Sequence, residues 1–157
     1  EKIAVIIEAL TDNKNRTVSN IRSIFQKFGG NLGESGVASY QFKQVGIVRI
    51  SKDKIADSEI LELAVNCGAE DCLFHDSYYE VLTSKEQFYK VKLELEKKIN
   101  NFLSSNVEWI PKNKILLNLN KEKSEQLINF LETLENEDDV QHIYTNFELN
   151  DNQAKTT

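Results

Sequence analysis

The first part of the chain alternates between an apolar run and a segment with helical periodicity. Residues 2–10 are mostly apolar and predict a strand. The polar side chains of Thr11, Asp12 and Asn13 follow, and such oxygens satisfy free backbone N–H groups where a strand turns into a helix. Residues 14–28 then predict an amphipathic helix that packs on a sheet, with an apolar stripe formed by Val18, Ile21, Ile24, Phe25 and Phe28.

The opposite face of this predicted helix is polar and basic. It consists of two neighbouring stripes, the first made of Arg16, Asn20, Ser23 and Lys27 and the second of Asn15, Ser19, Arg22 and Gln26. Such a face presents guanidinium, ammonium and amide groups to solvent or to a partner. It therefore indicates surface recognition and not catalysis.

The middle of the chain repeats strand and helix patterns in the order strand, helix, strand, strand, helix, strand. The expected elements are residues 46–51, 57–67, 71–76, 79–83, 85–103 and 107–111. Asp57 or Ser58 is the expected N-cap of the first helix, and Ser84 that of the second. This order is that of a complete ferredoxin-like unit.

The remaining segments predict a second unit around the first. Strands are expected at residues 37–43, 115–119 and 140–149, and a helix at 121–134. We therefore expect an α+β protein with two ferredoxin-like units, the second inserted into the first. The outer domain comprises residues 1–44 and 114–150, the inserted domain 45–113, and residues 151–157 form a disordered tail. Three successive small units are the alternative, which leaves the first sheet two-stranded and poorly covered.

A glycine-rich loop follows the basic helix. Gly29, Gly30, Gly33 and Gly36 could cradle an anion on backbone N–H groups, but nucleotide-binding loops run from a strand into a helix, and this loop leaves a helix. A helix C-cap at Gly29 or Gly30, with turns at Gly33 and Gly36, is the favoured interpretation. The loop tip, with Asn31 and Ser35, remains a candidate recognition element.

Charge is distributed unevenly along the chain. The net charge of the 157 residues is −6, but residues 1–45 carry six basic and four acidic side chains, so the remainder carries −8. A basic face on an acidic body can dock on phosphates in one orientation only. No apolar stretch approaches the roughly 20 residues that span a bilayer, so no membrane partner is expected.

The pattern offers little support for an enzyme or a metal protein. Cys67, Cys72 and His75 lie close in sequence, but structural zinc needs four ligands and the other histidine, His142, is distant. An acidic cluster consists of Glu132, Glu135, Glu137, Asp138 and Asp139. No nucleophile or base lies at a spacing that would make these carboxylates catalytic. We expect the cluster to be solvated, and a docking surface for a basic protein is the alternative. We expect no cofactor, no catalytic residues and no small-molecule substrate.

Several long motifs carry a family resemblance. In order, they are LTDNKNRT, IFQKFGGNLGESG, GAEDC, VEWIPKN and LENEDDVQHIYTN. Over residues 3–149 the chain resembles the YebC/PmpR family of gene-expression regulators, and the resemblance implies the same nested arrangement of units. It also implies a basic, mainly helical N-terminal domain before the position of Glu1. This sequence lacks that domain and contains no methionine, which we interpret as a truncated, proteolysed or partly ordered product.

The resemblance implies a regulatory function. The bacterial members that the chain resembles are described as sequence-specific DNA-binding transcriptional regulators. Related mitochondrial members resemble a translational activator of cytochrome c oxidase subunit I, which acts at the ribosome. We expect a transcriptional regulator in the bacterial cytoplasm, with translation regulation on ribosomal RNA, in bacteria or the mitochondrial matrix, and a pure protein-interaction module as alternatives. The expected contact residues are Asn13, Lys14, Asn15, Arg16, Arg22, Lys27, Asn31 and Ser35.

Overall fold

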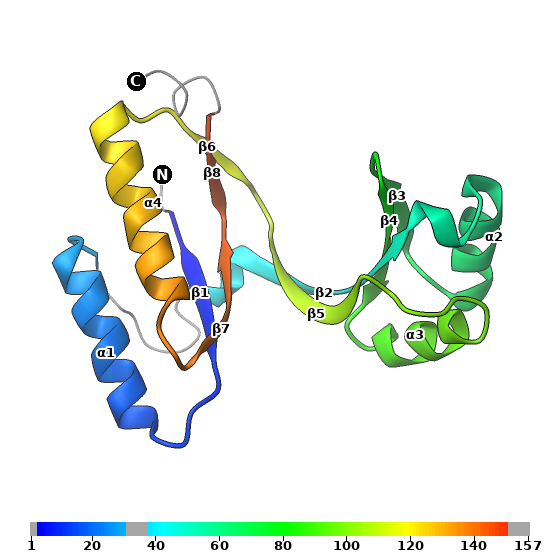
Figure 1. Ribbon diagram of the computed structural model, residues 1–157, viewed down its shortest axis with the longest axis horizontal. Coiled ribbons are helices and arrows are strands. Elements are labelled where there is room, and N and C mark those ends of the chain that lie inside the picture. The colour runs from blue at the N-terminus through cyan, green and yellow to red at the C-terminus, as the bar shows by residue number, and fades with distance from the viewer. Residues whose placement is uncertain (1–2, 31–37, 151–157) are drawn as a thin grey trace. The chain divides into compact units, whose positions relative to one another are not determined.

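The computed structural model describes residues 3–30 and 38–150, which form two compact units (Figure 1). The outer unit is built from the chain up to Lys43 and from Pro111 onward, and the inserted unit from Gln44 to Ile110. The fold is α+β with mainly antiparallel strand pairs, so the predicted class is confirmed. The predicted disordered tail at 151–157 lies outside the described residues.

The inserted unit has the predicted ferredoxin-like order of elements. These are β2 (Phe42–Ser51), α2 (Asp57–Cys67), β3 (Asp71–Phe74), β4 (Tyr78–Ser84), α3 (Phe88–Glu96) and β5 (Ser104–Pro111). The strands form one sheet in the order β3-β4-β2-β5, and β4 pairs antiparallel with both β2 and β3. This permuted order is what two strand-helix-strand repeats produce when they share one sheet.

The core of the inserted unit lies between its sheet and its two helices. Alternate residues of β2 and β4 point toward the helices, so Val48, Ile50 and Val81 are fully buried beside Ile60 of α2 and Leu95 of α3. Burial of about five such aliphatic side chains contributes roughly 1.5–3 kcal/mol each. This core is the main source of stability of the unit.

Two helix boundaries in the inserted unit differ from the prediction. The N-cap of α2 is Ala56, not Asp57 or Ser58, and the Asp57 carboxylate accepts a hydrogen bond from the Tyr79 hydroxyl. The helix expected at 85–103 is shorter, because the chain ends α3 at Glu96 and turns through Asn101, which has a positive φ of 58°. The Ser84 Oγ accepts a hydrogen bond from the Gln87 N–H one turn before α3 begins.

The outer unit combines two helices with four short strands. Its elements are β1 (Val5–Ala9), α1 (Lys14–Lys27), β6 (Ile115–Leu117), α4 (Lys121–Glu135), β7 (Val140–Thr145) and β8 (Phe147–Leu149). β1 pairs antiparallel with β7, and β6 pairs parallel with β8. In Figure 1, α1 and α4 lie side by side. The Phe130 ring of α4 contacts Phe25 and Phe28, with ring centroids 5.1 and 5.4 Å apart.

Two predicted strands of the outer unit are wrong in detail. The segment expected as a strand at 37–43 contains a short 3-10 helix, Ser39–Gln41, and extended structure begins only at Phe42, where β2 starts. The strand expected at 140–149 is interrupted at Asn146, which separates β7 from β8. The interruption coincides with the change of pairing partner from β1 to β6.

Asn146 is buried at this interruption and bonds to three other segments. Its backbone N–H donates to the Ala4 carbonyl at 3.2 Å, and its side-chain Oδ1 accepts from the Ala4 N–H at 2.7 Å. Its carbonyl accepts from the Ile115 N–H at 2.8 Å, and its Nδ2 donates to Gln41 Oε1 at 3.1 Å. One residue thus connects the beginning of the chain and the 3-10 helix through its side chain, and the last strand pair through its backbone.

Replacing Asn146 by alanine should destabilise the protein by about 2–3 kcal/mol, because the buried Ala4 N–H loses its acceptor and Gln41 loses its donor. Urea denaturation of the two proteins measures this difference. The exposed Asn129 of α4 provides the control, since alanine there should cost nothing measurable. Equal denaturation midpoints for all three proteins would contradict the role assigned to Asn146.

Candidate nucleic-acid interface

Helix α1 starts at a side-chain cap, as its sequence predicts. The Asn13 Oδ1 accepts a hydrogen bond from the Arg16 N–H at 3.1 Å, and the Thr11 Oγ1 accepts one from the Asn13 N–H at 3.0 Å. The cap satisfies one of the free N–H groups of the first turn. Asn13 is therefore occupied by the helix itself, although it stands among the predicted contact residues.

The other end of α1 is closed by the two glycines that follow it. Gly29 has a φ of +82°, its N–H donates to the Gln26 carbonyl, and the Gly30 N–H donates to the Phe25 carbonyl at 2.8 Å. This pair of bonds around a left-handed residue is a Schellman cap. Gly29 and Gly30 thus end the helix, whereas Asn31, Gly33, Ser35 and Gly36 lie outside the described residues.

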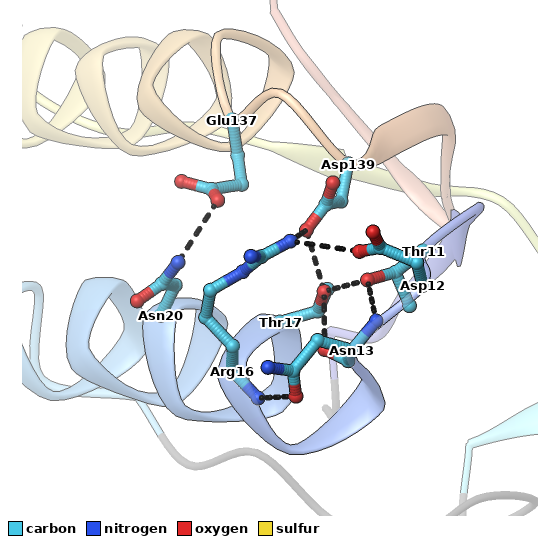
Figure 2. Close-up of polar contacts among 8 residues, drawn as sticks. All are labelled: Thr11, Asp12, Asn13, Arg16, Thr17, Asn20, Glu137 and Asp139. Atoms are coloured by element: carbon cyan, nitrogen blue, oxygen red, sulfur yellow. Dashed lines mark hydrogen bonds and ion pairs between the residues drawn. The ribbon is translucent and has the colours of Figure 1, made fainter.

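The first two turns of α1 are bound to the turn between α4 and β7, as Figure 2 shows. The buried Thr17 hydroxyl donates to Asp139 Oδ2. The Arg16 guanidinium lies 3.2 Å from Asp12 Oδ1 and 3.7 Å from Asp139 Oδ2. Asn20 Nδ2 donates to Glu137 Oε1 at 3.2 Å. The basic stripe predicted from Arg16 to Lys27 is therefore partly used for internal contacts at its N-terminal end.

The environment of Asp139 favours the carboxylate. The hydrogen bond from the Thr17 hydroxyl, and next the positive charge of Arg16, lower the pKa of Asp139 below its ordinary value, although partial burial opposes the shift. This negative group lies at the N-terminal end of α1, where the helix dipole attracts anions.

Three cations of α1 are exposed and have no such partner. Lys14, Arg22 and Lys27 have no carboxylate within 4.0 Å among residues 3–30 and 38–150. Arg22 and Lys27 are separated by about 140° around the helix axis, as five residues of helix require. Between them lies a neutral exposed strip that can donate and accept hydrogen bonds, made of Asn15, Ser19, Ser23 and Gln26.

The acidic cluster at the end of α4 has two parts. Glu137 and Asp139 contact α1, as described above, and are structural. Glu132, Glu135 and Asp138 are exposed. The predicted docking surface for a basic protein is therefore smaller than the sequence suggested.

The two cysteines show no sign of reactivity. Cys67 is buried and Cys72 half-buried, and burial raises the pKa of both thiols. Within the described residues, no group of three His, Cys, Asp or Glu side chains is arranged to hold a metal ion. Across the same residues, no helix has the length and apolar character needed to cross a membrane.

The sequence patterns missed one polar cluster, which lies in the inserted unit. Arg49 of β2 bonds through Nε to Glu80 at 2.8 Å and through Nη1 to Glu108 at 2.6 Å, and His75 Nε2 lies 2.6 Å from the other Glu80 oxygen. The bond to Glu108 is the main cause that raises the Arg49 pKa. The sequence contained one indication of this cluster, because Arg49 lies between apolar residues in the predicted strand 46–51. Because its donors are paired internally, this cluster is not a binding site.

A pH dependence follows from the contact between Thr17 and Asp139. Thr17→Val removes the hydroxyl that lowers the Asp139 pKa, so the variant should be less stable than the wild type near neutral pH. A depressed carboxyl pKa adds stability above the unfolded value of 3.8, and this stability is lost as the pH falls through the folded value. The difference between wild type and variant should therefore shrink below about pH 4.

Denaturation curves of both proteins between pH 7 and pH 2.5 measure this difference. Serine at position 17 is the control, because it keeps the hydroxyl and should retain the pH dependence. A wild-type advantage over Thr17→Val that stays constant down to pH 2.5 would show that the Asp139 carboxylate is not involved.

Comparison with known proteins places the chain in a family. Residues 1–147 match the family described as TACO1/YebC second and third domain. A probable transcriptional regulatory protein of Pelagibacter ubique is 51% identical over 152 residues, covering 97% of this chain and 62% of that protein. One from Sulfurihydrogenibium is 41% identical over 148 residues, covering 94% of this chain and 59% of that protein.

A solved structure agrees with the fold. The crystal structure of a conserved hypothetical protein from Aquifex aeolicus superposes with a TM-score of 0.78 at 37% identity, covering 94% of this chain and 60% of that one. The chain thus spans about three fifths of the length of these relatives. The relatives are named as regulators and not as enzymes. The chain belongs to the TACO1/YebC family, in which it corresponds to the second and third domains.

Proposed function

We propose that this chain is part of a non-enzymatic regulator of gene expression that binds nucleic acid through the exposed face of α1. The outer domain, residues 1–44 and 114–150, carries this face, and residues 45–113 form a separate inserted domain. The names of the relatives support the regulatory part of the proposal, since they describe transcriptional regulatory proteins. The charges on α1 support the binding part.

The observation that carries the proposal is the set of unpaired cations on a helix with both ends held in place. Arg16 is bonded to Asp12 and Asp139, but Lys14, Arg22 and Lys27 have no carboxylate partner among the described residues. Lys14 lies about 140° from Lys27 around the helix axis, on the side away from the neutral strip, so Arg22 and Lys27 are the cations of the proposed face. Because caps and Phe130 hold α1, a partner does not have to order this backbone when it binds.

The residue types on this face are those that contact a nucleic-acid backbone. Lysine and arginine neutralise phosphates, and neutral Ser, Asn and Gln side chains bond to phosphate and sugar oxygens. The outer face of α1 contains both kinds side by side. The carboxylates near its N-terminus, Asp12 and Asp139, repel phosphate, so contact is expected along the part of the helix that carries Arg22 and Lys27.

Duplex DNA in the bacterial cytoplasm is the first candidate target, because transcription takes place on DNA and the bacterial relatives are named as probable transcriptional regulatory proteins. Ribosomal RNA is the second candidate. Side chains that contact phosphate and sugar recognise the shape of a folded RNA and do not have to contact its bases. The neutral strip between Arg22 and Lys27 supports either target.

Replacing Lys14, Arg22 and Lys27 together by alanine should weaken nucleic-acid binding by about tenfold or more and reduce the slope of log Kd against log salt by roughly one unit per lost phosphate contact. Fluorescence anisotropy of the native protein with a labelled 30-base-pair duplex DNA and a structured RNA of equal charge gives both quantities. The thermal midpoint should stay nearly unchanged, since exposed charges contribute little to stability.

A matched variant changes three exposed lysines elsewhere in the outer unit, Lys112, Lys121 and Lys123, and removes the same net charge. It should retain most of the affinity. Equal losses in the two variants would mean that only net charge matters, and unchanged binding in the α1 variant would exclude this face. Tighter binding to RNA than to DNA would favour the ribosomal target.

A further inference from the structure

Strand β3 of the inserted unit is an open edge of its sheet. Among the described residues it pairs only with β4, on one side. The backbone groups on the other side of an edge strand can pair with another chain. The Cys72 N–H of β3 donates to Asp71 Oδ1 at 2.7 Å, so a partner strand that pairs there has to displace this carboxylate. With four residues, Asp71–Phe74, β3 offers a short template of this kind.

An apolar groove of ≈ 130 Å³ runs beside this edge, between β3 and α2. Leu61, Ala64 and Val65 of α2 line one side, and Cys72 of β3 lies on the other. Leu61 is 49% exposed and Val65 68% exposed, four residues apart on one stripe of the helix. Ile60, about 100° from Leu61 around the helix axis, is fully buried. Helix α2 is thus apolar on its core side and also on the side that borders the open edge.

The charged residues that line the groove, Glu70 and Asp71, are both acidic. Residues 57–72 contain five carboxylates and no lysine or arginine. Glu62, Glu70 and Asp71 are exposed, and Glu70 and Asp71 line the groove. Apolar side chains bordered by unbalanced negative charge complement a partner that alternates apolar and cationic residues.

We propose that the β3 edge and this groove bind an extended, cationic segment of a protein partner, which adds to the sheet as a fifth strand. Its backbone pairs with β3, its apolar side chains pack against Leu61 and Val65, and its lysines or arginines face Glu62 and Glu70. The carboxylates disfavour nucleic acid at this site. They also disfavour a second copy of the chain, because antiparallel pairing of two β3 edges brings two acidic borders together.

The proposal is independent of the function assigned to α1, since the residues belong to different units. The native protein, labelled with ¹⁵N, is titrated with the synthetic peptide Ac-KVKVKVK-NH₂ and followed by two-dimensional NMR. Shifts are expected for the amides of residues 61–65 and 70–74. The peptide Ac-EVEVEVE-NH₂ should bind at least tenfold more weakly.

Two variants test the two parts of the surface. Leu61→Ser with Val65→Ser should weaken binding of the lysine peptide at least fivefold, whereas Leu93→Ser, at a 43% exposed leucine of α3, should not. Glu62→Lys with Glu70→Lys should reverse the preference between the two peptides. The spectra of the variants also show that they remain folded.

Three outcomes would overturn the proposal. One is the absence of shifts at residues 70–74, and another is an unchanged peptide preference in the charge-reversed variant. The third is concentration-dependent self-association that protects the same amides in the absence of peptide, which would assign the edge to a second copy. None of these outcomes affects binding of nucleic acid by α1, so the two proposals fail separately.

Discussion

The outer unit depends on the buried side chain of Asn146. This unit is assembled from the two ends of the chain, and the hydrogen bond between Asn146 and Ala4 joins residues 142 positions apart. Closing so long a loop costs conformational entropy, which local structure does not recover. Asn146 offsets part of this cost, because its backbone and amide groups satisfy Ala4, Ile115 and Gln41 at one point. Asn146 also separates β7 from β8. The last part of the chain can therefore pair first with β1 and then with β6.

A second long-range contact prepares α1 for its proposed function. Thr17 and Arg16 bind Asp139, which lies after α4, and this contact fixes the N-terminal end of α1 against the rest of the unit. The contact also separates charges along the helix. Negative groups surround the N-terminal end, and the unpaired cations Arg22 and Lys27 lie farther along. The net charge of the protein is −6, yet the exposed face of α1 near Arg22 and Lys27 is basic.

Local patterns predicted what local chemistry determines. Helical periodicity and the Asn13 cap placed α1, Gly29 and Gly30 marked its end, and strand and helix order identified the ferredoxin-like unit. The patterns failed where a distant partner decides. The sequence predicted one strand over residues 140–149, because no local feature indicates that the strand changes its pairing partner at Asn146. The sequence predicted Arg16 as a free surface cation, although Asp12, four residues before it, pairs with it; its second partner, Asp139, is more than a hundred residues away.

The central claim is that the outer face of α1 touches nucleic acid. Ultraviolet crosslinking of the native protein in cells, followed by mass spectrometry of the peptides that carry nucleotides and sequencing of the attached nucleic acid, tests it most directly. The account predicts adducts within residues 14–27, with Arg22 or Lys27 close to the modified position. Adducts confined to residues 44–110 or to α4, with none in α1, would contradict it.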